Sequence, residues 1–238
     1  MLKRLCLSAL TFGAALQALP AFASFHLMQI EQVIGGVSQD ENHQAIQLRM
    51  RIAGQNLVSF ARIRAWDSAG ANPVLIINFT TNVANANMGD HILIASPLFA
   101  ATWGPAPDFI MTNLIPAAYL AAGKLTFEDD SGAFVYWSLA WGGAAYTGTN
   151  TGTTDNDADG QFNPPFGSAL PSIFNNALRF NGSAGALSTN NAADYSVTAG
   201  AATFVNNAGQ SAEVGLLPQA AVGPAAGGAS RVRLIGTE

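Results

Sequence analysis

The sequence predicts an all-β protein, built as a sandwich or a barrel. Short segments with period-two alternation of apolar and polar residues follow one another along the chain, and Gly, Asn, Asp and Pro mark turns between them. No segment has the pattern of a helix of usual length, so the crossover helices that a parallel α/β fold needs are missing. Of the 238 residues, the roughly 215 that follow an expected N-terminal signal peptide suffice for one large all-β domain.

The clearest pair of strands is a hairpin in the middle of the chain. Its arms are Leu125–Glu128 and Ala133–Trp141, and an Asp-Asp-Ser-Gly turn joins them. Side chains alternate across a strand, so four residues of the second arm share one face, which we expect to be core: Val135, Trp137, Leu139 and Trp141.

Further strands are expected on both sides of this hairpin. In Ala45–Ile52 the residues Ile46, Leu48, Met50 and Ile52 point one way, and in Phe25–Ile34 we expect Met28, Ile30, Gln32 and Ile34 to share a face opposite Gln29 and Glu31. The other expected strands are Val58–Trp66, Pro73–Phe79, His91–Ala95, Ala177–Phe180, Tyr195–Thr198, Ala202–Val205 and a terminal Arg231–Ile235. Short helical turns are expected at Pro116–Ala122 and Ser172–Asn176, and irregular structure at Leu98–Thr112.

The first 23 residues have the pattern of a secretory signal peptide. Lys3 and Arg4 precede an apolar stretch, and Ala21-Phe22-Ala23 is a small-x-small cleavage site. Cleavage there removes Cys6, the only cysteine, so we expect a cysteine-free secreted protein, located outside the cell, at its surface or in the periplasm. We expect a domain over residues 24–205 and a Gly/Ala-rich tail over 206–238.

The net charge of the mature chain argues against general binding of polyanions such as nucleic acids. Eight basic residues remain after loss of the signal against 15 acidic ones, a net charge of about −7. No later apolar segment is long enough to span a membrane.

Several segments occur in an order that carries a family resemblance: Ile30-Glu31-Gln32-Val33, Ile46-Gln47-Leu48-Arg49, Gly123–Phe127 followed by Gly132, Trp141-Gly142, Ala177–Phe180 and Ser188–Tyr195. Together they resemble the lamin-tail domain, which is found in animal lamins and in many secreted or surface proteins of bacteria. The likeness spans about Phe25–Asn207, and it departs at Gln47–Met50, which lacks the family's acidic residue and Asn. The resemblance implies an immunoglobulin-like antiparallel β-sandwich with long loops, at most one or two short helical turns, and a non-catalytic role.

An acidic loop follows the hairpin and is the candidate metal site. Asp155, Asp157 and Asp159 alternate and Gly160 comes next, the opening of many calcium loops. Phe166 occupies the position of the closing Glu of an EF-hand, so this is not an EF-hand. We expect either a structural Ca²⁺ held by the three carboxylates or a solvated Asx-rich loop.

Four arginines and two aromatic residues are the candidate ligand-binding residues. Arg49, Arg51, Arg62 and Arg64 are expected on the outward faces of two neighbouring strands, where they would grip an anionic polymer or a partner protein, or else form a solvated face. Trp103 and Tyr146 lie in expected loops and are candidates for stacking on sugars.

No catalytic motif occurs in the sequence. The three histidines are not in metal-ligand spacing, and no nucleophile elbow is present. The sequence therefore favours a secreted structural or binding module that is not an enzyme, with an unknown extracellular protein or polysaccharide as partner. The alternatives are a carbohydrate-binding module, a secreted hydrolase, and a self-assembling surface subunit in which Arg231–Ile235 adds to the sheet of a neighbour.

Overall fold

The computed structural model describes residues 25–218 and is mainly β, with 33% strand, 10% helix and no helix of seven residues or more. Open sheets are stacked on one another, which confirms the all-β prediction. The expected signal peptide and the expected strand Arg231–Ile235 lie outside the described residues. None of the described helices is long and apolar enough to cross a membrane.

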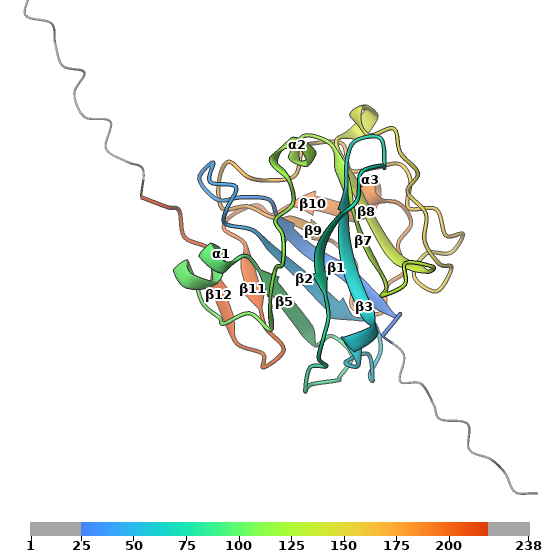
Figure 1. Cartoon of the computed structure of the whole chain (residues 1–238), viewed down its shortest axis with the longest axis horizontal. Coiled ribbons are helices and arrows are strands. Elements are labelled where there is room, and N and C mark those ends of the chain that lie inside the picture. The colour runs from blue at the N-terminus through green and yellow to red at the C-terminus, as the bar shows by residue number, and fades with distance from the viewer. Residues whose placement is uncertain (1–24, 219–238) are drawn as a thin grey trace, which may run out of the picture.

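The larger sheet has six strands in the order β10-β9-β1-β2-β5-β6 (Figure 1). Neighbouring strands are antiparallel except β5 and β6, which are parallel. The strands are β1 (Met28–Ile34), β2 (Ala45–Met50), β5 (His91–Ala95), β6 (Phe109–Ile110), β9 (Leu178–Phe180) and β10 (Tyr195–Val197).

The smaller sheet has four antiparallel strands in the order β4-β3-β7-β8. They are β3 (Ala61–Trp66), β4 (Val74–Asn78), β7 (Gly123–Asp129) and β8 (Val135–Trp141). The hairpin that the sequence predicts is therefore confirmed as β7–β8.

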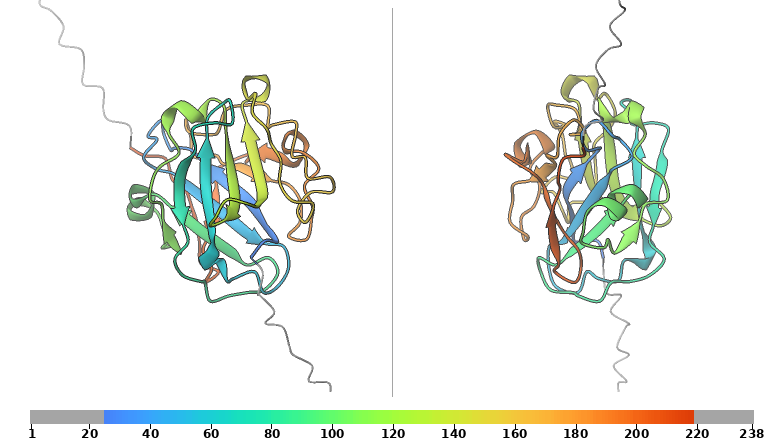
Figure 2. Two further views of the ribbon diagram at one scale, coloured as in Figure 1. Left: turned by 45° about the vertical axis from the view of Figure 1, so that its right-hand side comes forward. Right: turned by 90° about the vertical axis from the view of Figure 1, so that its left-hand side faces the viewer.

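A third layer covers the far side of the six-stranded sheet. It is the hairpin of β11 (Thr203–Val205) and β12 (Ser211–Glu213), which the right-hand view of Figure 2 shows in red beside the six-stranded sheet. Phe204 and Val214 are buried there with Leu93 of β5 and Phe99. The prediction of a linker after Val205 is wrong for this part of the chain, because β12 is too short to show periodicity.

The main core lies between the two larger sheets. Ile46, Leu48 and Met50 of β2 face Trp137 and other residues of the four-stranded sheet, and all are fully buried. Leu139 and Trp141 are buried in the same core, as alternation along β8 predicts. Ile52 lies beyond the end of β2 and is 46% exposed, so the expected strand ends earlier than predicted.

A β-bulge in β1 overturns the expected alternation of that strand. Ile30 pairs with Leu48 and Gln32 with Gln47, so Glu31 is the extra residue. The extra residue reverses the faces of all later positions. Val33 therefore joins the main core, while Ile34 joins the core beneath the β11–β12 hairpin.

The helices are short, as the sequence predicts, but their places in the chain differ from the prediction in two segments. They are α1 (Pro97–Thr102), α2 (Ala117–Leu120), α3 (Asn191–Asp194) and 3₁₀ turns at Val58–Phe60 and Gly143–Ala145. The segment expected to be irregular contains α1 and β6; Ser96 caps α1, because its side chain accepts a hydrogen bond from the Phe99 amide. The helical turn expected at Ser172–Asn176 does not form.

Candidate functional site

A buried carboxylate organises the outer side of the six-stranded sheet. Glu31 is 1% exposed, and its Oε1 lies 2.8 Å from Nη1 of Arg49. Its Oε2 lies 3.0 Å from Nε2 of His91 and accepts a hydrogen bond of 2.7 Å from Gln47. Arg179 contributes a longer contact of 3.6 Å.

These partners keep Glu31 ionised. Burial on its own would raise the pKa of this carboxyl, but the hydrogen bond with His91 and the charge of Arg49 outweigh burial and hold the pKa below its ordinary value. A catalytic general acid needs a raised pKa, so the lowered pKa of Glu31 does not suit that role.

A second buried carboxylate lies on the outer face of the four-stranded sheet. Glu128 on β7 is fully buried, and both Arg62 and Arg64 of β3 bind it, at 3.1 Å and 2.6 Å. The hydroxyl of Thr126 donates a hydrogen bond to the same group. The guanidinium of Arg64 lies 4.4 Å from the ring centre of Trp66, on which Lys124 also lies at 5.1 Å.

The four arginines do not form one stripe, so that prediction is wrong. β2 pairs with β1 and β5, and β3 pairs with β4 and β7, which places the two arginine pairs in different sheets. Arg51 is 8% exposed and binds loop atoms: it donates to the carbonyls of Asp155 and Ala186 and to Oδ1 of Asn156. Arg51 is therefore an anchor for two loops.

The acidic loop does not bring its three carboxylates together. Asp155 lies 3.5 Å from Nε2 of His26 and is half exposed, whereas Asp157 is 1% exposed. Oδ1 of Asp157 accepts a hydrogen bond from the Asp159 amide at 3.1 Å. Within residues 25–218, no three His, Cys, Asp or Glu side chains are grouped so that they could hold a metal ion.

Asp157 and Asp159 influence each other. Burial, and after it the neighbouring Asp159 carboxylate, raises the pKa of Asp157. The neighbouring Asp157 side chain and the hydrogen bond from the Gln161 amide lower the pKa of Asp159. The protonation of one carboxylate therefore depends on that of the other.

Buried asparagines fix the long loop after β8, a role that the sequence did not reveal. The side-chain amide of Asn191 forms two hydrogen bonds with the backbone of β8. Its Oδ1 accepts from the Ala140 amide, and its Nδ2 donates to the Ser138 carbonyl. Asn150 donates to Asn191, and Asn156 donates to the Tyr136 carbonyl. The high Asn content of the chain was the available signal, but it does not say which residues are buried.

The two candidate sugar-stacking residues contribute little exposed aromatic surface. Tyr146 is 6% exposed and donates its hydroxyl to the Thr149 carbonyl, so it is not on a surface platform. Trp103 ends α1, is partly buried and packs on His43 and Phe99. The expectation of an exposed platform is therefore wrong for Tyr146, because its loop folds back onto Ala122 and Ala140.

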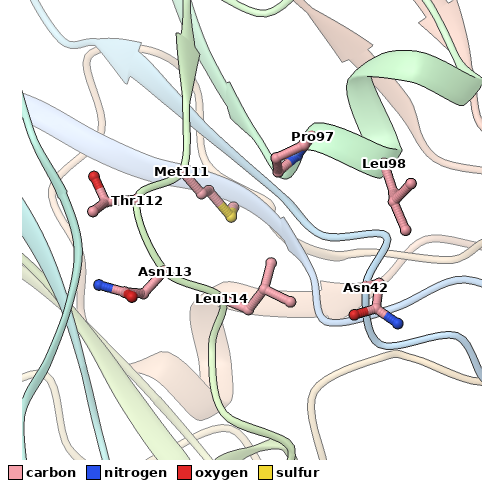
Figure 3. A pocket seen from close by; sticks show the side chains of 7 residues that line it. All are labelled: Asn42, Pro97, Leu98, Met111, Thr112, Asn113 and Leu114. Atoms are coloured by element: carbon pink, nitrogen blue, oxygen red, sulfur yellow. The ribbon is translucent and has the colours of Figure 1, made fainter.

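A pocket of about 320 Å³ lies between α1 and the segment that follows β6 (Figure 3). Figure 3 shows Met111 and Leu114 reaching toward the segment that carries Pro97 and Leu98. Asn42, Thr112 and Asn113 complete the lining, and none of these side chains titrates. The side chains that line this pocket therefore include no acid or base.

A comparison of the chain with protein-family models, curated proteins and solved structures finds no significant match.

Proposed function

We propose that this protein is a secreted, non-catalytic module that acts as a structural or binding element. The observation that carries the proposal is the way in which its buried glutamates are used. Glu31 and Glu128 each form ion pairs with arginines of a neighbouring strand. Their charges therefore connect β1 to β2 and β7 to β3.

Glutamine substitutions test whether these glutamates are structural. We expect Glu31→Gln and Glu128→Gln to lower the melting temperature, and we expect no turnover of ester, glycoside or peptide substrates by the parent protein. Turnover by the parent protein that is lost in a glutamine variant of unchanged melting temperature would contradict the proposal.

An immunoglobulin-like, lamin-tail type of sandwich is part of this proposal. The segments that carry the resemblance support it, because they lie on strands of the stacked sheets: β1, β2, β7 and β9, with Trp141 at the end of β8. The segment that ends at Tyr195 also contacts the core of the sandwich. Tyr195 accepts a hydrogen bond from Trp137 and donates to the Ile30 carbonyl.

A binding role is favoured by the outer face of the four-stranded sheet. Arg62 and Arg64 bind Glu128 there and Lys124 lies beside them on Trp66, although the chain as a whole is acidic. Phe60, which directly precedes β3, is 65% exposed, and Phe134, which precedes β8, is 59% exposed. Arginine and aromatic side chains are the usual anchors of binding surfaces. We infer that this face binds an acidic polysaccharide.

Affinity electrophoresis in gels that contain polygalacturonate tests the binding role, with neutral dextran as the reference. We expect retardation by the acidic polymer only, weakened by added salt and by Phe60→Ala. Phe174→Ala is the matched control, because Phe174 is similarly exposed at 64% but belongs to the segment between the 3₁₀ turn Gly143–Ala145 and β9. Equal effects of the two variants, or no retardation, would contradict this assignment.

A further inference from the structure

Three acidic side chains are buried in the part of the chain that the structure describes, and one of them lacks a cationic partner. Glu31, Glu128 and Asp157 are each at most 1% exposed. Arginines neutralise the two glutamates. Among residues 25–218, no Lys, Arg or His forms an ion pair with Asp157.

One oxygen of Asp157 is also unsatisfied. Oδ1 accepts from the Asp159 amide, but Oδ2 is buried without a hydrogen-bond partner. The hydroxyl oxygen of Thr153, four positions earlier in the same loop, is likewise buried and without a partner. Buried oxygens of this kind are strongly destabilising unless a bound group satisfies them, and a carboxylate more so than a hydroxyl.

The surroundings of Asp157 can hold a small ligand. A pocket of about 310 Å³ is lined by Asp157, Ala158, Asp159, Leu187, Ser188 and Thr189. The Ser188 amide donates to the Asn156 carbonyl, which joins the two sides of the pocket. Asn156 is in turn held by Arg51 and by the Tyr136 carbonyl, so the position of Asp157 is fixed from both sides.

We propose that Asp157 and Asp159 bind a hard divalent cation of the Ca²⁺ class, and that Asp155 is not a ligand. Two adjacent carboxylates supply the charge that such a cation requires, and neutral oxygens of the loop with water complete the six to eight ligands that Ca²⁺ takes. Asp155 is excluded because its carboxylate is turned to His26 on the surface. The structure thus divides the three aspartates, which the sequence pattern treats as equivalent.

The competing explanation for the lack of a cationic partner is that Asp157 and Asp159 share a single proton. The two explanations differ in their response to Ca²⁺. A cation site makes the melting temperature depend on Ca²⁺ concentration, whereas a shared proton makes it depend on pH alone.

The test is thermal unfolding of the purified full chain in EDTA and in increasing CaCl₂, with isothermal titration calorimetry to measure binding. We expect a rise of roughly 5–10 °C at a hundredfold excess of Ca²⁺ over its Kd. Asp159→Asn removes a charge but keeps the oxygen that the Gln161 amide binds, and Asp159 is exposed, so we expect this variant to fold and to lose the rise. Asp157→Asn should also lose it.

Asp155→Asn is the matched control, because it removes a charge from the same loop at a surface ion pair. We expect it to retain the full response to Ca²⁺. Loss of the response in Asp155→Asn would overturn the two-carboxylate assignment. A parent protein that shows neither a calorimetric signal nor a shift with Ca²⁺ would overturn the cation site and leave the shared proton.

Discussion

Glu31 and Arg49 form an ion pair of 2.8 Å across neighbouring strands, at the residue where β1 bulges. The bulge inserts Glu31 as an extra residue, and its carboxylate then meets Arg49 and His91 on the outer side of the six-stranded sheet. One local irregularity thus creates the buried ion cluster on which this side of the sheet depends.

The first prediction concerns acid stability. Glu31 has a pKa below its ordinary value of 4.5, so the folded state binds fewer protons than the unfolded state between the two pKa values. The stabilisation by Glu31 is therefore complete above about pH 4.5 and is lost as the pH falls through the folded-state pKa. Urea denaturation from pH 6 to 2.5 should show a shallower decline for Glu31→Gln than for the parent protein. Parallel declines would show that Glu31 does not contribute to acid sensitivity.

The second prediction concerns Lys124. Burial lowers its pKa to about 8, despite the attraction of Glu128. The folded state then binds fewer protons than the unfolded state between pH 8 and about 10.5, so the unfolding free energy should rise with pH across the lower part of that range, by on the order of 2 kcal/mol. Lys124→Met should remove this rise, as measured by urea denaturation from pH 7 to 9.5. A rise that persists in the variant would contradict the assignment.

The third prediction concerns Asn191, whose side-chain oxygen and nitrogen each form a hydrogen bond with the backbone of β8. Asn191→Ala should lower the unfolding free energy by about 2–4 kcal/mol, because buried amide and carbonyl groups lose their partners. Asn87→Ala is the control, since Asn87 is exposed. Chemical denaturation of both variants checks the difference; equal stability would mean that water replaces the Asn191 side chain.

The fourth prediction concerns the hydroxyl of Tyr195, which joins Trp137 to the Ile30 carbonyl in the core. Tyr195→Phe should destabilise the protein by about 1–3 kcal/mol, because two buried groups lose a hydrogen bond. Tyr119→Phe removes a hydroxyl that bonds the Asn72 carbonyl near the surface and should cost less than about 1 kcal/mol. Melting curves that do not separate the two variants would refute this account.

Features within one strand could be predicted from the sequence, and features that depend on distant partners could not. The faces of Trp137 and Leu139 follow from alternation, and the structure confirms them. The prediction of an arginine stripe was wrong because strands that are far apart in the sequence pair with each other. Arg62, for example, bonds Glu128, which lies 66 positions later. No sequence signal marks the bulge at Glu31, and one extra residue exchanges the faces of Val33 and Ile34.

The candidate metal loop shows the same limit. Its alternating aspartates predict a cation site, but the position and the burial of each aspartate side chain depend on contacts with distant parts of the chain. His26 takes Asp155 to the surface, while the strand-like bridge to Ser188 buries Asp157. The choice between ligands therefore becomes visible only in the folded chain.

The most direct measurement of the central claim, that the buried glutamates are structural, is the unfolding free energy of Glu31→Gln at pH 7. Glu213→Gln, at an exposed glutamate of β12, is its reference. The account predicts a loss of about 3 kcal/mol for Glu31→Gln, because Arg49 is left without its anionic partner, and a change within about 0.5 kcal/mol for Glu213→Gln. Equal stability of the two variants would contradict it.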